Sequence, residues 1–196
     1  MSEDYSAEKK EGTVLFCDIR NFTNLFEEED PLKAVEFANN VLAVLGEEVE
    51  KMGGTVDRFT GDGFLAHFGI ADESKNHALS ACKGAINMRK ALTEINNQRY
   101  FDVEEVVSIG IGINTGEIAK GEIKTPQINQ KTIFGDVVNT AARIEGLTKY
   151  FSVDILISQT CLEHVGQDFQ FQKMPARSLR GKNKEVSTYW LLPINF

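Results

Sequence analysis

The sequence predicts an α/β (α+β) sandwich in which helices cover one face of a mainly antiparallel sheet. Two observations support this fold class. The hydrophobic pattern gives the order β-α-β-β-α-β, followed by additional α and β elements. The 196 residues are 42% hydrophobic and 26% charged, a composition typical of one globular domain with a sizeable core. We expect a flexible leader over residues 1–11 and a single domain over 12–196, with a second copy of the chain covering the remaining sheet face or edge.

The first half of the chain contains two helices and three strands. The buried strand GTVLFCDI ends at Asp18. Asp30 and Pro31 are placed as the N-cap and first residue of a long amphipathic helix. The segments GTVDRF and FLAHFG form a β-hairpin around the tight turn TGDG, which places Asp62 in an exposed loop. A second long helix is expected over about residues 72–97.

The second half begins with the long strand EVVSIGIGINTG. Its glycines do not match GxGxxG and do not open a helix, which argues against dinucleotide binding. The polar stretch KTPQINQKTIF is expected to be a loop or arm. The elements that follow are the helix GDVVNTAARIEGLTKY, the strand VDILIS, the helix QTCLEHV, the strand DFQFQKM, the basic turn SLRGKNK and the strand EVSTYWLL.

Charge and composition exclude several classes of protein. The net charge of -8 argues against binding to nucleic acids or anionic membranes, which requires clustered cations. No apolar run approaches the roughly 20 residues that span a bilayer, and the polar N-terminal sequence is unlike a signal peptide, so we expect a cytoplasmic protein. Cys17, Cys82 and Cys161 lack CxxC spacing and are expected to be buried free thiols.

Two aspartates form the first candidate site. Asp18 closes the first strand and Asp62 lies in the following hairpin turn, so pairing of these strands would bring both carboxylates together as ligands for hard divalent cations. The residue pattern leaves a structural alternative open, in which Asp18 caps a helix starting near Phe22 and Asp62 serves only the DG turn.

A second candidate group lies in the helix GDVVNTAARIE. Asn139 and Arg143 are four residues apart and therefore on one helical face. Arg143 can stabilise developing phosphate charge, and Asn139 can orient a sugar or a nucleophile. Lys182, in the turn RGKNK, can hold a polyphosphate. For each of these residues the pattern alone also fits an ordinary solvated surface.

Together these segments resemble a known family. The stretches FCDIRNFT, RFTGDGFLAHFG, SIGIGINTGEIAKGEI, TIFGDVVNTAARIE and LRGKNKEVSTYWL resemble, in order, the motifs of the class III nucleotidyl cyclase catalytic domain. The resemblance implies a ferredoxin-like or palm βαββαβ core and a homodimer with two active sites at its interface. It also implies conversion of a nucleoside triphosphate into a 3′,5′-cyclic nucleotide and pyrophosphate.

The resemblance further implies a role for each motif residue. One chain supplies the ligands of two Mg²⁺ or Mn²⁺ ions, and the other supplies base-reading and transition-state residues. The implied metal ligands are Asp18, Ile19 and Asp62; Asn139 and Arg143 act on the ribose and α-phosphate; and Ile19, Asn21, Phe22 and Lys182 bind phosphates. A diguanylate cyclase of the GGDEF type is rejected, because its signature string is absent.

Arg58 is the main departure from the family pattern. In purine cyclases the position four residues before the second metal aspartate reads the base, with lysine for adenine and glutamate for guanine. Thr132, the implied partner position, matches many bacterial adenylyl cyclases. Guanine is disfavoured because its N1–H and N2–H donors would face only donors on Arg58. Adenine remains possible, through N1 and the N6 amine.

Uracil suits Arg58 better, because its carbonyl oxygens accept charge-assisted hydrogen bonds worth about 1.5–3 kcal/mol. Cytosine should bind more weakly. The compact chain with this arginine resembles the pyrimidine cyclases of bacterial anti-phage (Pycsar) systems, which implies UTP as substrate, cyclic UMP as product and a cyclic-nucleotide-responsive effector downstream. Alternatives are an adenylyl cyclase, a catalytically silent nucleotide-binding domain, and a structural Arg58 paired with Asp57 or a neighbouring glutamate.

Overall fold

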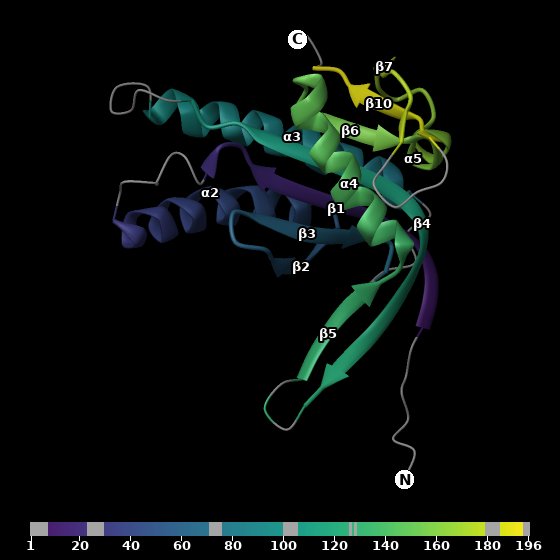
Figure 1. Cartoon of the computed structure of the whole chain (residues 1–196), viewed down its shortest axis with the longest axis horizontal. Coiled ribbons are helices and arrows are strands. Elements are labelled where there is room, and N and C mark those ends of the chain that lie inside the picture. Colours follow the sequence, from purple (N-terminus) through teal and green to yellow (C-terminus); the bar gives the residue numbers. More distant parts are fainter. Residues whose placement is uncertain are drawn as a thin grey trace.

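The computed structural model describes residues 8–22, 30–70, 76–99, 106–125, 127, 129–178 and 185–193. The predicted helices and strands occur in the predicted order, together with short strands that were not predicted (Figure 1). The helices and strands are β1 (Glu8–Ile19), α2 (Pro31–Lys51), β2 (Thr55–Phe59), β3 (Gly63–Phe68), α3 (His77–Arg99), β4 (Ile109–Lys124), β5 (Asn129–Phe134), α4 (Asp136–Phe151), β6 (Ile155–Ser158), α5 (Gln159–Val165), β7 (Phe171–Lys173), β8 (Arg177–Ser178), β9 (Glu185–Val186) and β10 (Thr188–Leu191).

One large sheet organises the described residues. Its strand order is β2-β3-β1-β4-β6-β10-β7, and β5 pairs with β4 beyond this path. The β4–β6 pair is parallel and the other pairs are antiparallel, which confirms the mainly antiparallel sheet. The strand expected over EVSTYWLL divides into two strands, because β9 leaves the large sheet to pair with β8.

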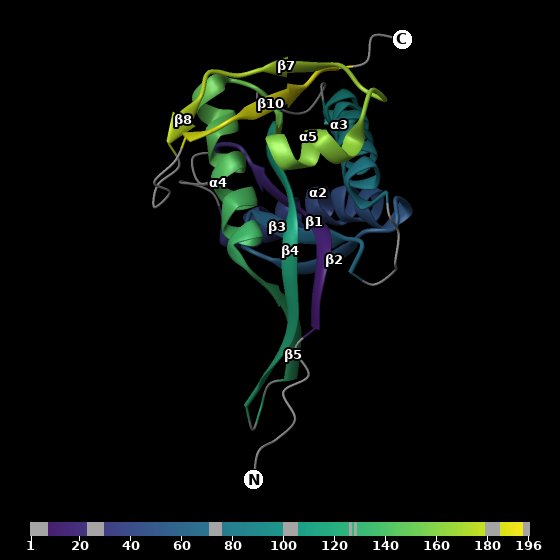
Figure 2. The same cartoon turned by 90° about the vertical axis from the view of Figure 1, so that its right-hand side faces the viewer.

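Helices cover both faces of the sheet, so the expectation of one covered face was wrong. Alternate residues of β1 point to opposite sides. Leu15 and Cys17 join the core under α2, α3 and α5, whereas Val14 packs with Val137 and Ala141 of α4. Figure 2 shows α4 on one side of the sheet and α2, α3 and α5 on the other. The apolar residues of GDVVNTAARIE therefore cover the face that the prediction had left for a second copy.

Two segments expected to lack structure belong to strands. Residues 8–11, assigned to the leader, pair with β4 from Glu8↔Lys120 onward. The stretch expected to be a polar loop is largely strand, because β4 continues to Lys124 and pairs with β5 over Ala119↔Phe134. Figure 1 shows this hairpin projecting away from the body of the domain. The arm was therefore predicted correctly, but not its extended, paired conformation.

The predicted helix signals hold for α2. The Asp30 carboxylate accepts a hydrogen bond from the Leu32 N–H at 2.9 Å, and Pro31 occupies the first turn. All three cysteines are buried free thiols, as predicted. Across the described part of the chain, no helix combines the length and apolarity needed to cross a bilayer.

Candidate active site

Asp18 and Asp62 meet where β1 ends beside the β2–β3 turn. The β1–β3 register pairs Asp18 with Gly63, and the Ile19 N–H donates to the Asp62 carbonyl at 2.9 Å. A Cβ atom at Gly63 would lie 2.3 Å from the Cys17 carbonyl oxygen, so only glycine permits this approach. The predicted pair of carboxylates is therefore formed within one chain. Asp62 is half-buried rather than fully exposed.

The electrostatics of this pair are unfavourable without a cation. Burial, together with the carboxylates of Asp62 and Glu145, raises the pKa of Asp18 from 3.8 to about 7, while Arg20 opposes the shift. The two carboxyl groups also share a side-chain hydrogen bond, which favours a protonated Asp18. Two half-buried carboxylates facing each other are the hard oxygen donors that Mg²⁺ and Mn²⁺ prefer, so the residues fit such a group.

The metal ligands available from the described residues are few. No group of three or more histidine, cysteine, aspartate or glutamate side chains there is arranged to hold a metal ion. Any further protein ligand would come from the backbone, such as the Ile19 carbonyl. Mg²⁺ ordinarily keeps several waters and completes its shell with substrate phosphates beside one or two carboxylates, which a two-aspartate site allows.

The turn after β1 only partly fits its expected phosphate role. The Ile19 side chain is buried in the core, and the N–H groups of Ile19 and Arg20 donate to Asp62 and Ser108 carbonyls. The Ile19 N–H is therefore already paired within the chain. Asn21 is exposed and adopts a left-handed backbone conformation with φ 56°, and Phe22 packs on Phe37. Asn21 and Phe22 remain the predicted phosphate contacts of this turn.

Asn139 and Arg143 lie away from the sheet on α4. The buried residues of this helix include Val138, Ala141 and Ile144, whereas Asn139 is exposed and Arg143 half-buried. Within the described residues, no hydrogen bond or ion pair joins either side chain to Asp18 or Asp62. One chain thus presents two separate groups of candidate residues.

Arg58 and Thr132 do come together, although they lie 74 residues apart. Arg58 Nη1 donates to Thr132 Oγ1, joining β2 to β5. Asp57 completes the group. Its Oδ2 accepts from Arg58 Nη1 at 2.7 Å and from Thr132 Oγ1 at 2.7 Å. The Arg58–Asp57 ion pair is the contact that the sequence analysis left open as a structural alternative. The contact of both residues with Thr132 was not predicted, because regular strand alternation would place Asp57 and Arg58 on opposite faces.

Arg20 and Glu145 were also missed by the sequence reasoning. Arg20 Nη2 lies 2.6 Å from Glu145 Oε1 and also donates to the Glu145 carbonyl at 3.2 Å. Burial raises the pKa of Glu145, although Arg20 opposes the shift. Both residues stand inside quoted motifs, FCDIRNFT and NTAARIE, and this opposite-charge pair was the available signal. Lys182 lies outside the described residues.

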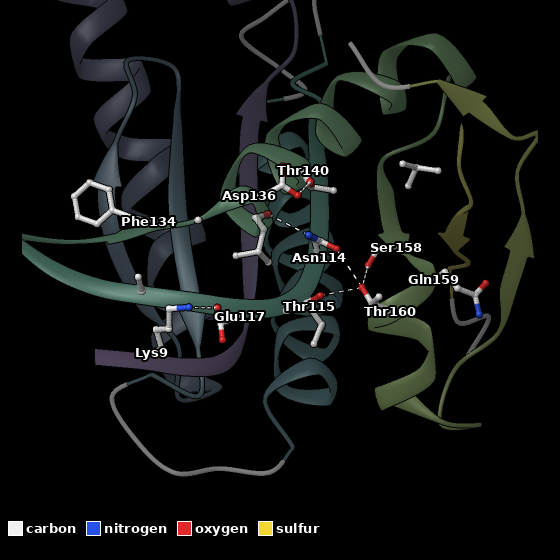
Figure 3. Close-up of a pocket in the computed structure, with 15 residues that line it drawn as sticks. Lys9, Asn114, Thr115, Glu117, Phe134, Asp136, Thr140, Ser158, Gln159 and Thr160 are labelled. Atoms are coloured by element: carbon white, nitrogen blue, oxygen red, sulfur yellow. Dashed lines mark hydrogen bonds and ion pairs between the residues drawn. The ribbon is translucent and has the colours of Figure 1, made fainter. Parts of the chain in front are cut away.

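A cavity of about 590 Å³ lies elsewhere, between β4, the start of α4 and α5 (Figure 3). None of the sequence-predicted site residues lines it. Asn114 Nδ2 donates to the Val137 carbonyl at 3.1 Å, and Thr160 Oγ1 donates to the Thr115 carbonyl at 2.9 Å. These polar groups fasten the two helices to β4. The cavity is therefore separate from the aspartate pair.

Comparison with known proteins identifies the family. The protein-family model named adenylate and guanylate cyclase catalytic domain matches residues 5–193 of this chain. The chain belongs to this class III cyclase family. Its domain is therefore a nucleotidyl cyclase catalytic domain, and enzymes of this class generally use divalent metal ions.

Curated relatives of the cyclase domain include adenylate cyclases. The adenylate cyclase of Anabaena cylindrica is 32% identical over 191 residues, which cover 94% of this chain and 37% of that protein. The terminal-differentiation-specific adenylate cyclase of Dictyostelium discoideum is 34% identical over 185 residues, which cover 92% of this chain and 8% of that protein. The chain thus spans well under half of each of these relatives.

Solved structures of cyclases share the fold. The adenylyl cyclase CyaB from P. aeruginosa superposes with a TM-score of 0.88 at 28% identity and covers 97% of both chains. The guanylyl cyclase Cya2 gives a TM-score of 0.87 at 29% identity, covering 96% of this chain and 95% of that one. The predicted fold class is confirmed. The similar scores for an adenylyl and a guanylyl cyclase do not distinguish between nucleobases.

Proposed function

We propose that this cyclase domain converts UTP into 3′,5′-cyclic UMP and pyrophosphate. The observation that carries the choice of base is the contact between Arg58 and Thr132. This contact joins the two positions that the family pattern assigns to base recognition. At one of them, arginine replaces the lysine or glutamate of the purine cyclases. Uracil offers carbonyl oxygens to the guanidinium and an N3–H to the threonine oxygen.

The reaction needs no protein nucleophile. The ribose 3′-oxygen forms a bond to the α-phosphorus, the bond from that phosphorus to the bridging oxygen of the β-phosphate breaks, and pyrophosphate leaves while the hydroxyl proton passes to solvent. Two divalent cations held by Asp18, Asp62 and the Ile19 carbonyl would activate the hydroxyl and stabilise the leaving oxygen when bound. Positioning and charge neutralisation supply most of the acceleration of phosphoryl transfer.

The remaining chemistry is assigned to a second copy of the chain. Its Asn139 would orient the ribose, its Arg143 would stabilise charge on the α-phosphate and its Lys182 would bind the other phosphates. Asn21 and Phe22 of the first copy, which follow Asp18, would also contact those phosphates. The separation of the aspartate pair from Asn139 and Arg143 within one chain supports a homodimer, because each site can then draw one group from each partner. Two equivalent sites would form per dimer.

Cyclic UMP would act as a second messenger in anti-phage defence, through an effector that responds to cyclic nucleotides without contacting the cyclase. This part of the proposal rests on the arginine-bearing resemblance to Pycsar cyclases alone. Its test is phage challenge of cells carrying the wild-type chain or Asp62→Ala, together with their cyclic nucleotide content. Protection that is equal in both strains would sink the role in defence.

The nucleotide assay is a direct test of the activity. Purified protein is incubated with Mn²⁺ and equal concentrations of ATP, GTP, CTP and UTP, and the cyclic products are identified by mass, with Asp62→Ala as control. Cyclic UMP as the main product supports the proposal. Nucleotide binding without pyrophosphate release would instead indicate a catalytically silent domain.

Adenylyl cyclase activity is the second candidate. The relatives at 32% and 34% identity are adenylate cyclases, and Thr132 can accept a hydrogen bond from the N6 amine of adenine. Arg58 would then donate to N1. Cyclic AMP as the main product of the same assay would favour this reading and make Arg58 a substitute for the family's lysine.

A further inference from the structure

Asp57 is brought to the base-reading pair by an irregularity in β2. The β2–β3 register shifts between Val56, opposite Ala66, and Arg58, opposite Leu65, which leaves Asp57 as the extra residue of a β-bulge. Consecutive strand residues normally face opposite sides, but here Asp57 and Arg58 both reach Thr132. The Asp57 side chain is only 4% exposed, against 37% for Arg58. Asp57 therefore lies behind the pair, with Arg58 toward the open side.

The hydrogen bonds of Thr132 fix the direction of its hydroxyl. This hydroxyl has one proton, and it donates that proton to Asp57 Oδ2 at 2.7 Å. Its oxygen also accepts a hydrogen bond from Arg58 Nη1. Thr132 can therefore offer a nucleobase only a lone pair. Without the carboxylate, the hydroxyl would be free to rotate and to donate.

The same carboxylate limits what Arg58 can offer. Nη1 carries two hydrogens and has two acceptors within the chain, Asp57 Oδ2 and Thr132 Oγ1. The Arg58 nitrogen atoms left to donate hydrogen bonds to a base are Nη2 and Nε. The buried negative charge also balances the arginine, so a neutral base meets an ion pair rather than an isolated cation. The pocket thus presents arginine donors beside one obligatory acceptor.

We propose that Asp57 is a specificity-determining residue that holds Thr132 as a hydrogen-bond acceptor and thereby selects a base with an N–H group at that position. The inference rests on the proposed role of Arg58 and Thr132 in base recognition. Uracil meets this requirement through N3–H. Cytosine, of the same size, has an unprotonated N3 that needs a donor, so the orientation of one hydroxyl separates UTP from CTP.

The test is the isosteric variant Asp57→Asn. Its amide can donate to Thr132 Oγ1, which frees the hydroxyl proton to donate to N3 of cytosine. We expect the ratio of kcat/KM for UTP to that for CTP to fall about tenfold. An equal loss for every nucleotide, or an unchanged ratio in folded protein, would overturn the proposal.

Two further variants secure the interpretation. Asp154→Asn breaks another partly buried ion pair, with Arg89 at 2.5 Å, and should lower the melting temperature without changing the ratio. Thr132→Val removes the hydroxyl itself and should lose the same discrimination in a chain that keeps Asp57. If Asp57→Asn does not fold, Thr132→Val decides. An unchanged ratio of kcat/KM for UTP to that for CTP in this variant overturns the proposal, and a fall in that ratio supports it.

The same measurements separate this inference from the proposed substrate. The wild-type product mixture decides between UTP and ATP, whereas the effect of Asp57→Asn on the ratios among the four nucleotides decides the role of Asp57. If the wild-type enzyme prefers ATP but Asp57→Asn changes its preference among the bases, UTP is not the substrate and the role proposed for Asp57 is supported. If the wild-type enzyme prefers UTP and Asp57→Asn leaves the ratios among the four nucleotides unchanged, the substrate is supported and the role of Asp57 is overturned.

Discussion

Arg20 Nη2 lies 2.6 Å from Glu145 Oε1, across the boundary between β1 and α4. The ion pair joins the turn that follows Asp18 to the helix that carries Asn139 and Arg143. Its side chains are only 15% and 9% exposed. Each chain therefore connects the metal side of one proposed site to the α4 residues that it would present to the other site.

Arg20→Gln should destabilise the domain strongly, because it leaves the Glu145 carboxylate buried without the cation that opposes the rise of its pKa. We expect a loss of about 2–3 kcal/mol, or roughly 4–12 °C in melting temperature. The matched control is Glu117→Gln, which removes an ion pair with Lys9 of 2.7 Å that is largely exposed. That change should cost under about 1 kcal/mol. Equal effects in thermal unfolding would contradict a structural role for the buried pair.

The proposed active site, shared between two copies of the chain, predicts complementation between inactive variants. Asp18→Ala and Asn139→Ala should each abolish activity alone, but a heterodimer of the two has one site in which every residue is intact. After equal mixing and exchange, about a quarter of the wild-type activity should return. The measurement is pyrophosphate release against the fraction of each variant.

Asp62→Ala supplies the control for this mixture. Both Asp18→Ala and Asp62→Ala damage the metal side, so their heterodimer contains no intact site and should stay inactive. Failure of the first pair to recover activity, with dimers present, would argue against an interface site. Recovery in the second pair would argue against placing both aspartates on the same side.

Local signals in the sequence predicted much of the fold and part of the site. The Asp30–Pro31 signal predicted the start of α2, and the hairpin around TGDG predicted that Asp62 would approach Asp18. The cap and the hairpin depend on residues close in sequence, whereas the approach of Asp62 to Asp18 also required β1 to pair with β3. The residue types and their spacing in the sequence were therefore enough to predict the cap and the hairpin.

Long-range packing could not be read in the same way. The position of α4 on the second sheet face depends on which side of the sheet its connections reach, and the pattern of GDVVNTAARIE is the same on either face. The bulge at Asp57 depends on pairing with β3, and its contact with Thr132 depends on the β4–β5 hairpin. A strand pattern without these partners gives Asp57 the wrong face.

Asp18 should make the stability of the metal-free protein depend on pH. Its pKa is raised from 3.8 to about 7 in the folded state, so over this interval the folded chain binds more protons than the unfolded one. Stability should therefore fall as the pH rises from about 4 to 7, and this contribution should be constant above 7. The raised pKa reflects burial and the neighbouring carboxylates.

The variant Asp18→Asn removes this titration. At pH 8 in chelator it should melt roughly 2–8 °C above the wild type, about 1–2 kcal/mol after discounting for the solvent around a half-exposed group. At pH 4 the two proteins should melt alike. Mn²⁺ should stabilise the wild type at pH 8 and have little effect on the variant. A variant that is less stable than the wild type at pH 8 would contradict the repulsion between Asp18 and Asp62.

Arg58→Lys should move substrate preference from UTP toward ATP. The ammonium cannot reproduce the planar fork that donates to Asp57 and Thr132 while leaving Nη2 for the base. The shorter side chain of lysine also leaves more room for a purine. We expect the ratio of kcat/KM for UTP to that for ATP to fall by about tenfold or more. Arg177→Lys is the control, since Arg177 stacks 3.5 Å above the Tyr150 ring. If both variants keep the wild-type ratio, Arg58 only braces β2 against β5, and the choice of base must be made elsewhere in the dimer.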